Sequence, residues 1–422
     1  MKGMIFPSCC GIYSKLILFL KWLVLLYNSD MKKFLAISIF IFLIINISFS
    51  KEFLSEDSET LDVYFEKIEE GGYLFYGDNN HFIPQFISLG FTKLTNLKMD
   101  RANPSQVVLE PGDKGVLLAT LTPLDKNRSY SFRSRLSYTP GNPLTVEPDE
   151  FVYLFPFEHG SKFKLDQGFG GQFSHQKENY YALDFSMDIG TPIVAARAGI
   201  VVEVKEDSNR GGASSSYASY GNFISIYHDD GTFASYVHLK KNGAIVEVGD
   251  SVSMGDTIGY SGNTGLSTGP HLHFSVNVPT VTGSRQSIPI KLLGLDGEAI
   301  DPVVGEYYYS KHPGGESFDP VFGKDLKDSD FSGTLTPIKQ TDKLSFRDES
   351  IDSTTVVYCR NGFNSVVEGT ITFKFQNSFS SQGGSIPIKI PPLSESYVAL
   401  VKPKDTTKSF AFSYSISYRV LE

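Results

Sequence analysis

Two stretches of the chain repeat each other, and this duplication constrains the fold more than any other sequence feature. Residues 111–138 (PGDKGVLLATLTPLDKNRSYSFRSRLSY) align without gaps on residues 391–418 (PPLSESYVALVKPKDTTKSFAFSYSISY). The identical pairs are Pro111/Pro391, Ala119/Ala399, Pro123/Pro403, Asp125/Asp405, Ser129/Ser409, Phe132/Phe412, Ser137/Ser417 and Tyr138/Tyr418. Both copies end in a run in which apolar residues alternate mainly with Ser and Arg, and this period is typical of strands with one buried face. We therefore predict two related small β-sandwich domains.

The composition extends this prediction to a mainly β fold. The chain has 422 residues, more than one core usually serves, and it contains 33 Phe and 22 Tyr but few long helix-forming runs. Between the repeats, Gly, Asp and Asn separate short Val/Ile runs, which indicates hairpins in a central antiparallel sheet. The predicted organisation is an N-terminal extension with a signal peptide at 1–50, a sandwich at 54–150, a central domain at 151–300, a linker at 301–330 and a second sandwich at 331–422. The sandwiches themselves carry no pattern typical of catalysis and are expected to be scaffolds or adhesion modules.

The first fifty residues have the pattern of an export signal. From Met31 the chain reads MKKFLAISIFIFLIINISFS, in which two lysines precede an apolar run that ends in small residues. We expect cleavage near Ser50, a mature start near residue 51, and an exported protein, periplasmic or extracellular, with no stable membrane domain afterwards. The upstream apolar stretch 16–27 is interrupted by Lys21. It is either a membrane segment or, as we favour, part of an extension ahead of the true start.

Charge argues against a nucleic-acid-binding protein, and the cysteine content argues against a protein stabilised by internal disulfides. The formal net charge is −9, and a negative field repels phosphate backbones, so nucleic acid is not expected as a partner. Cys9 and Cys10 lie in the segment expected to be removed, which leaves Cys359 without an internal disulfide partner. The alternating run TTVVYCRNG around Cys359 predicts a buried strand cysteine rather than a nucleophile.

Histidine is concentrated in the central domain. Five of the eight histidines fall within a hundred residues, together with one aspartate: His175, His228, His238, His271 and His273, with Asp184. On a strand, residues i and i+2 point to the same face, so His271 and His273 in PHLHFSV are expected to point into one place. Imidazole and carboxylate are common zinc ligands, and the set indicates a metal site. A hydrogen-bonded structural role is the alternative for any single histidine, and it is the expected role of His228, while His312 in the linker is expected to be solvated.

The central residues also resemble a known family, the lysostaphin/LytM-type zinc metallopeptidases that cut peptide bonds in bacterial peptidoglycan. The matching blocks are YALDFSMDIGTPIVAARAGIVV, YGNFISIYHDDGTFASYVHL and VGDSVSMGDTIGYSGNTGLSTGPHLHF. The resemblance implies a zinc-dependent endopeptidase that hydrolyses peptidoglycan cross-links, either glycine bridges or bonds of the stem peptides. It implies that Asp184 and His273 coordinate zinc, and that His238 and His271 act on substrate and water, with the general base unassigned between them.

One position departs from the common pattern of that family. The first histidine ligand is expected four residues before the aspartate, and here Tyr180 occupies that place. His175, nine residues before Asp184, is the nearest alternative and resembles a variant in which the ligand comes from a looser preceding segment. With His175, zinc has three protein ligands and an open position for catalysis. Without it, the domain resembles inactive members that bind the wall or activate a second wall hydrolase.

The loop 207–221 and the residue after it lie in sequence between the expected site residues. The loop 207–221 (DSNRGGASSSYASYG) is either a flexible insertion or a wall of the substrate groove. Asn222, which follows it, is expected on the family resemblance alone to form hydrogen bonds near the site.

Overall fold

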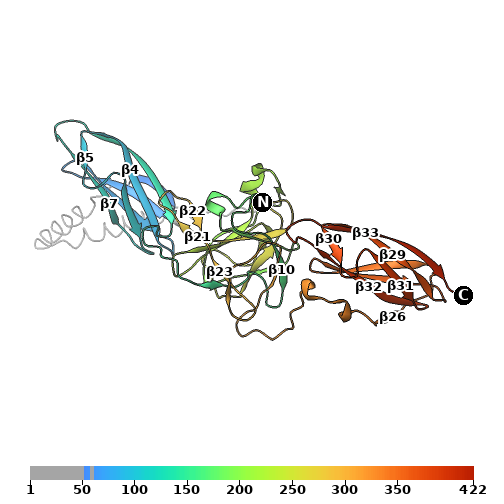
Figure 1. Cartoon of the computed structure of the whole chain (residues 1–422). Helices are drawn as coiled ribbons and strands as arrows, with labels where there is room; N and C mark the ends of the chain where they lie inside the picture. Colours follow the sequence, from blue (N-terminus) through green and yellow to red (C-terminus); the bar gives the residue numbers. More distant parts are fainter. Residues whose placement is uncertain (1–51, 58–60) are drawn as a thin grey trace, which may run out of the picture.

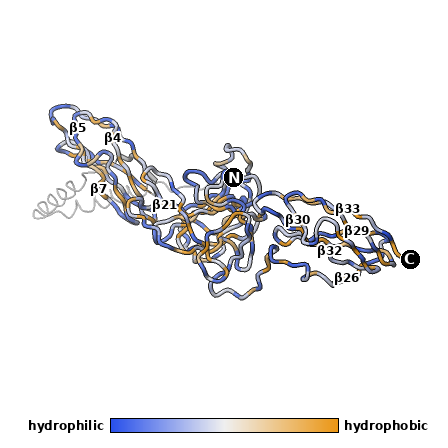
Figure 2. Tube along the Cα trace, viewed as in Figure 1, coloured by the Kyte–Doolittle hydropathy of each residue, from blue (hydrophilic) through white to orange (hydrophobic). Residues whose placement is uncertain are grey.

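The chain folds into three β-rich parts that lie end to end (Figure 1). The computed structural model describes residues 52–57 and 61–422. Regular structure in this range is almost all β-strand, which confirms the predicted mainly β fold, and its only helices are four short 3-10 turns. Figure 2 shows hydrophobic and hydrophilic residues alternating along many strands, with hydrophobic residues gathered in the central part. The expected extension and signal peptide at 1–50, including the stretch 16–27, lie outside the described residues.

The N-terminal part consists of two antiparallel sheets that share one core. The first sheet contains β1 (Glu52–Asp57), β2 (Leu61–Lys67), β3 (Tyr73–Asn79), β7 (Val116–Pro123) and β5 (Leu97–Met99), and the second contains β6 (Ser105–Leu109), β4 (Gln85–Thr95) and β8 (Ser131–Pro140). Phe75, Ile87 and Leu118 come from both sheets and are fully buried in the shared core. Phe132 of β8 packs edge-on against Phe75, with ring centroids 5.2 Å apart, a favourable aromatic geometry.

The C-terminal part also consists of two antiparallel sheets over one core. The first contains β26 (Leu335–Pro337), β32 (Ser394–Pro403), β28 (Thr354–Asn361), β27 (Leu344–Ile351) and β30 (Ser378–Ser380), and the second contains β31 (Ser385–Ile390), β29 (Val367–Gln376) and β33 (Ala411–Val420). Val357, Ile371 and Ala399 are fully buried between the sheets.

The two terminal parts pair their strands in the same order, as expected of a duplication. The order β2-β3-β7-β5 corresponds to β27-β28-β32-β30, and β6-β4-β8 corresponds to β31-β29-β33. Asn96 and Asn377 occupy equivalent turns, with φ of 52° and 50°, and their side-chain amides donate to the carbonyls of Asp125 and Asp405. Asparagine tolerates this left-handed backbone better than most residues. The exact domain boundaries remain predictions.

The central part is built on one nine-stranded sheet. Its strands are β18 (Ser251–Val252), β13 (Gly199–Lys205), β15 (Phe223–Tyr227), β16 (Phe233–Val237), β21 (His271–Pro279), β11 (Leu183–Ser186), β10 (Lys162–Gln167) and β25 (Tyr307–Tyr309) in spatial order, with β22 (Arg285–Ser287) paired to β21. Smaller sheets contain β12 (Pro192–Val194), β19 (Thr257–Ser261) and β17 (Leu239–Ala244); β14 (Gly211–Gly212) and β20 (Gly265–Leu266); and β24 (Ala299–Ile300), β23 (Lys291–Leu293) and β9 (Val152–Tyr153). The 3-10 turns are η1 (Lys177–Asn179), η2 (Ser215–Tyr220), η3 (Gly323–Asp325) and η4 (Asp328–Asp330).

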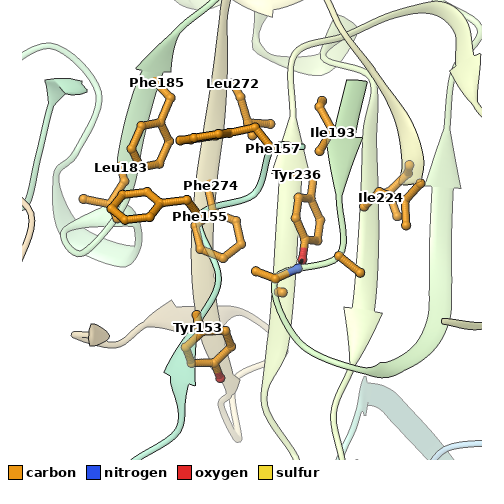
Figure 3. Packing of buried hydrophobic residues seen from close by; sticks show 14 of the residues in the cluster. Tyr153, Phe155, Phe157, Leu183, Phe185, Ile193, Ile224, Tyr236, Leu272 and Phe274 are labelled. Carbon is orange, nitrogen blue, oxygen red and sulfur yellow. Dashed lines mark hydrogen bonds between the residues drawn. The ribbon is translucent and has the colours of Figure 1, made fainter. Parts of the chain in front are cut away.

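The two faces of this sheet differ in chemistry because side chains alternate along each strand. Leu183, Phe274, Tyr236 and Ile224 are direct neighbours across four strands, and all are almost completely buried in the core (Figure 3). Burial of each such side chain stabilises the fold by about 1.5–3 kcal/mol. The residues next to them along the strands point to the opposite face, which carries the histidines of β21.

The N-terminal part contacts the central sheet through a small hydrophobic cluster. Ile83, from the segment between β3 and β4, packs with Val202 and Phe233 of the central sheet, and all three are buried. Thr139 of β8 also donates a hydrogen bond to the carbonyl of Thr280. One end of the central sheet is therefore covered by the neighbouring sandwich.

The stretch expected to be a linker contributes to the central sheet. Residues of β25 pair with β10, so the main sheet extends beyond residue 300. His312 follows β25 and is half-buried, with Nε2 3.1 Å from the carbonyl oxygen of Phe157. The prediction of a solvated His312 was therefore wrong, because β25 returns the chain to the core. In the described part of the chain, no helix combines the length and apolar character that crossing a bilayer requires.

Cys359 provides a test of the C-terminal core. It lies on β28, fully buried as predicted, and burial raises the pKa of its thiol to about 12. Because the thiolate is the reactive form, we expect Cys359 to resist iodoacetamide in the native protein and to react after unfolding in guanidinium. Peptide mass spectrometry distinguishes Cys359 from the other cysteines. Rapid native labelling at Cys359 would contradict the packing of this core.

Candidate metal centre

Strand pairing brings Asp184 and His273 together. Asp184 lies on β11 and His273 on β21, and the two are direct neighbours in the antiparallel register. Both side chains point to the face opposite the hydrophobic core, because Leu183 and Phe274 beside them enter that core. His273 Nδ1 lies 2.9 Å from Asp184 Oδ1, and both residues are buried.

His175 reaches the same carboxylate from the segment between β10 and η1. Its Nε2 lies 3.0 Å from Asp184 Oδ1, and the residue is completely buried. A bent backbone makes this approach possible: Gly170 has a φ of +68°, and a Cβ on Gly171 would lie 2.2 Å from the Cγ of Gln167. The possible ligand atoms of His175, Asp184 and His273 all lie within 4.8 Å of one another.

The hydrogen bonds of His175 show that this group fits a cation. His175 Nδ1 lies 2.7 Å from the carbonyl oxygen of Gly168, and since a carbonyl only accepts, Nδ1 carries the proton. In the neutral imidazole, Nε2 then presents a lone pair to the carboxylate of Asp184. Two facing acceptors are favourable only with a proton or metal ion between them, and this arrangement is typical of a histidine oriented as a metal ligand.

The surroundings keep Asp184 ionised. Burial alone raises the pKa of its carboxyl, but the close contacts with the imidazoles of His175 and His273 outweigh burial and hold that pKa well below its ordinary value. Gln167 on β10 donates from Nε2 to Asp184 Oδ2 over 2.7 Å, which fixes the second carboxylate oxygen. Gln167 was not among the candidate residues, because no local motif marks a residue that becomes relevant only through strand pairing.

His238 and His271 lie beside this cluster, with their ring centroids 4.5 Å apart. His238 Nδ1 lies 2.6 Å from the carbonyl oxygen of Thr264, and His271 Nδ1 lies 2.8 Å from that of Gly269. Both Nδ1 atoms therefore carry a proton, which leaves each Nε2 as the free ring nitrogen. Burial and the neighbouring imidazoles lower the pKa of His238 to about 3, so its ring is neutral near pH 7.

A buried hydrogen-bond network holds the backbone at His238. His238 has a φ of +70°, a left-handed conformation that is unusual for a residue with a side chain. Asn222 accepts a backbone hydrogen bond from Leu239 and donates one to Thr264 Oγ1, and its side chain bonds both backbone groups of Ser208. Asn222 thus forms hydrogen bonds beside the site, as the resemblance implied. The role of Thr264 was not predicted.

Two residues stay outside the cluster. Tyr180, at the place of the common histidine ligand, is exposed and packs on Tyr181, with ring centroids 4.9 Å apart. His228 is buried, and its Nδ1 lies 2.8 Å from the carbonyl oxygen of Ala198, in agreement with a structural role. Burial lowers the pKa of His228 to about 4.

A cavity of about 300 Å³ opens beside His273 and His238. Ala218 and Gly221, from the loop 207–221 and its end, line one wall, while Ser174 and Asn179 line the wall formed by the segment that carries His175. The loop contains η2 and pairs through β14 with β20. These contacts favour the interpretation of the loop as a groove wall over that of a flexible insertion.

Comparison with known proteins identifies the family that this part of the chain matches. Residues 178–292 match the model of Peptidase family M23. The matched range includes Asp184, His238, His271 and His273, and it begins just after His175.

Three relatives illustrate the extent of the match. An uncharacterized metalloprotease of Buchnera aphidicola subsp. Baizongia pistaciae is 36% identical over 166 residues, which cover 39% of this chain and 40% of the relative. Lysostaphin of Staphylococcus simulans is 42% identical over 119 residues, 28% of this chain and 22% of lysostaphin. The peptidoglycan DD-endopeptidase ShyA of Vibrio cholerae is 35% identical over 136 residues, 31% of this chain and 29% of ShyA. The chain thus spans less than half the length of each relative.

The geometry predicts which substitutions remove a bound metal. The Asp184→Ala and His175→Ala variants should lose zinc, because each removes one of the three candidate ligands, whereas Tyr180→Phe should retain it as the matched control. Metal analysis after dialysis, with one zinc per chain expected for the wild type, provides the measurement. Zinc lost from Tyr180→Phe but kept by His175→Ala would show that the ligand assignment is wrong.

Proposed function

Because the central part is a peptidase M23 domain, homologous to lysostaphin and to ShyA, we propose that this protein is a zinc-dependent endopeptidase that hydrolyses peptide cross-links of bacterial peptidoglycan. The observation that carries the proposal is the convergence of His175, Asp184 and His273 beside His238 and His271. The cavity next to these residues offers a place for a peptide.

The proposed metal ligands fit zinc in number and type. Two imidazoles and one carboxylate are a known ligand set of catalytic zinc sites, and three protein ligands leave a position for substrate or water. When bound, zinc activates water near neutral pH and polarises the carbonyl of the bond to be cut. Gly168 orients His175, and Gln167 orients Asp184, so the ligands are held in place before a metal binds.

His238 and His271 would act on the reacting groups. Their Nδ1 protons are bound by backbone carbonyls, so their Nε2 atoms are the ones available for proton transfer. One histidine accepts the proton of the attacking water at Nε2, and the other, when protonated at Nε2, donates a hydrogen bond to the developing oxyanion before a proton passes to the leaving amine. The network of Asn222 and Thr264 fixes the ring of His238 in this orientation.

The presence of all five site residues favours an active enzyme over the alternative, an inactive domain that binds the wall or activates a second hydrolase. An inactive domain needs none of the ordered contacts that orient His175, His238 and His271. The proposal also places the protein outside the cytoplasm, after export by the expected signal, because its substrate is the cell wall.

The proposal predicts a separation between metal binding and activity. His238→Ala and His271→Ala should retain zinc while the hydrolysis of defined muropeptides falls by about a hundredfold or more, because each removes a positioned proton-transfer group. Mass analysis of the digested muropeptides measures the rate and identifies the bond, and Tyr180→Phe is the control. Metal loss in both histidine variants would mean that His238 and His271 are metal ligands and that the roles assigned to the ligands and to the proton-transfer residues are wrong. Failure of the zinc-loaded wild type to cut any muropeptide would favour the inactive alternative.

A further inference from the structure

A row of serines runs across the sheet beside the metal cluster. Ser275 of β21 pairs with Ser235 of β16, which pairs with Ser225 of β15. Ser275 lies two residues beyond His273 on β21, so the two side chains point to the same face of the sheet. The serines paired with Ser275 therefore also lie on the face that carries the cluster. Ser235 and Ser275 line the cavity, and Asn277, the next residue on this face of β21, also lines it.

Arg285 of β22 lies at the other end of this row. Its Nη1 donates to Ser225 Oγ over 3.0 Å, and its Nη1 and Nη2 donate to the carboxylate of Glu203 over 3.2 and 2.9 Å. Its guanidinium carbon lies 3.9 Å from the centroid of the Phe233 ring, which covers one face of the group. Phe233 is itself held by Ile83 of the N-terminal sandwich. Arg285 is therefore fixed in position from three sides.

These contacts leave one edge of the guanidinium open. The group has five N–H donors, and the three hydrogen bonds above use both donors of Nη1 and one of Nη2. Among the described residues, no hydrogen bond uses Nε–H or the second Nη2–H, and these two donors point from the same edge of the planar fork. Two parallel N–H groups of this kind match the two oxygens of a carboxylate.

Arg285 is also the single permanently charged side chain that lines the cavity in the described part of the chain. The other lining residues are neutral or are the histidines of the site. Its charge is balanced by Glu203, so a preference for a carboxylate here rests on the two N–H donors that stay open rather than on a net positive field.

We propose that Arg285, with the adjoining polar row, is a carboxylate-binding subsite that selects peptides carrying a free carboxylate at a set distance from the scissile bond. This inference rests on the proposed endopeptidase function and deepens it, because it favours stem peptides, which carry carboxylates, over uncharged glycine bridges. Arg285 is a specificity-determining residue here and takes no part in the chemical step.

The sheet geometry sets the distance of that carboxylate from the reacting bond. Ser225 lies two strands away from Ser275, and Ser275 lies two residues beyond His273. With strands about 4.8 Å apart and a rise of about 3.3 Å per residue, Ser225, which the guanidinium contacts, lies about 12 Å from His273. An extended peptide spans this distance in about three or four residues, so the selected carboxylate should lie that far from the cleaved bond.

The test uses full-length, zinc-loaded protein and synthetic stem peptides in which each carboxylate is replaced in turn by a carboxamide. For the wild type, one replacement should lower kcat/KM by about tenfold or more, since it removes a bidentate charged contact. The Arg285→Gln variant should lose this discrimination, and Arg285→Lys should recover part of it because it keeps the charge but not the fork. Glu203→Gln is the matched control, because it alters the neighbour and keeps the guanidinium.

A binding measurement separates this proposal from the proposed function. Calorimetry of the same peptides with the His271→Ala variant, with and without Arg285→Gln, reports selectivity without hydrolysis. If the wild type cuts no peptide but Arg285→Gln still abolishes selective binding, the subsite stands and the endopeptidase proposal fails. If the peptides are cut and the discrimination is the same with and without Arg285, the subsite proposal is overturned while the endopeptidase proposal stands.

Discussion

The pairing of β11 with β21 is the contact on which the rest of the site depends. Its register places Asp184 directly beside His273, and strand alternation sends both side chains away from the hydrophobic core. A shift of one residue would exchange these side chains with Leu183 and Phe274, which fill the core. The burial of apolar residues on one face therefore fixes the polar residues on the other. Because the same alternation continues along β16 and β15, it also aligns the serines that connect the cluster with Arg285.

Loop residues complete the site that the sheet positions. His175 and Thr264 lie outside the strands, and their positions depend on backbone hydrogen bonds, such as those of Asn222 around His238. Such contacts orient imidazoles and select which ring nitrogen is free. The strands supply a rigid frame, and the loops supply orientation, which agrees with the general division between scaffold and functional loops.

The N-terminal sandwich flanks the central domain and also supports one residue of the cavity wall. Ile83 packs against Phe233, and Phe233 supports the guanidinium of Arg285, so a contact between two parts of the chain reaches the cavity wall. The C-terminal sandwich lies at the far end of the molecule (Figure 1). The two copies of the repeat share a strand order, yet they occupy different positions relative to the proposed substrate.

The sequence by itself determined the mainly β fold, the duplication and the side chains of the candidate cluster, because alternation and the HLH pattern are local properties of the chain. It could not settle whether His175 reaches Asp184, since that depends on the bend at Gly170 and Gly171. It was wrong about His312, because the pairing of β25 with β10 is a long-range contact. Gln167, Thr264 and Arg285 had no local signal at all. Their roles follow from strand register and packing between distant segments, which only the tertiary structure decided.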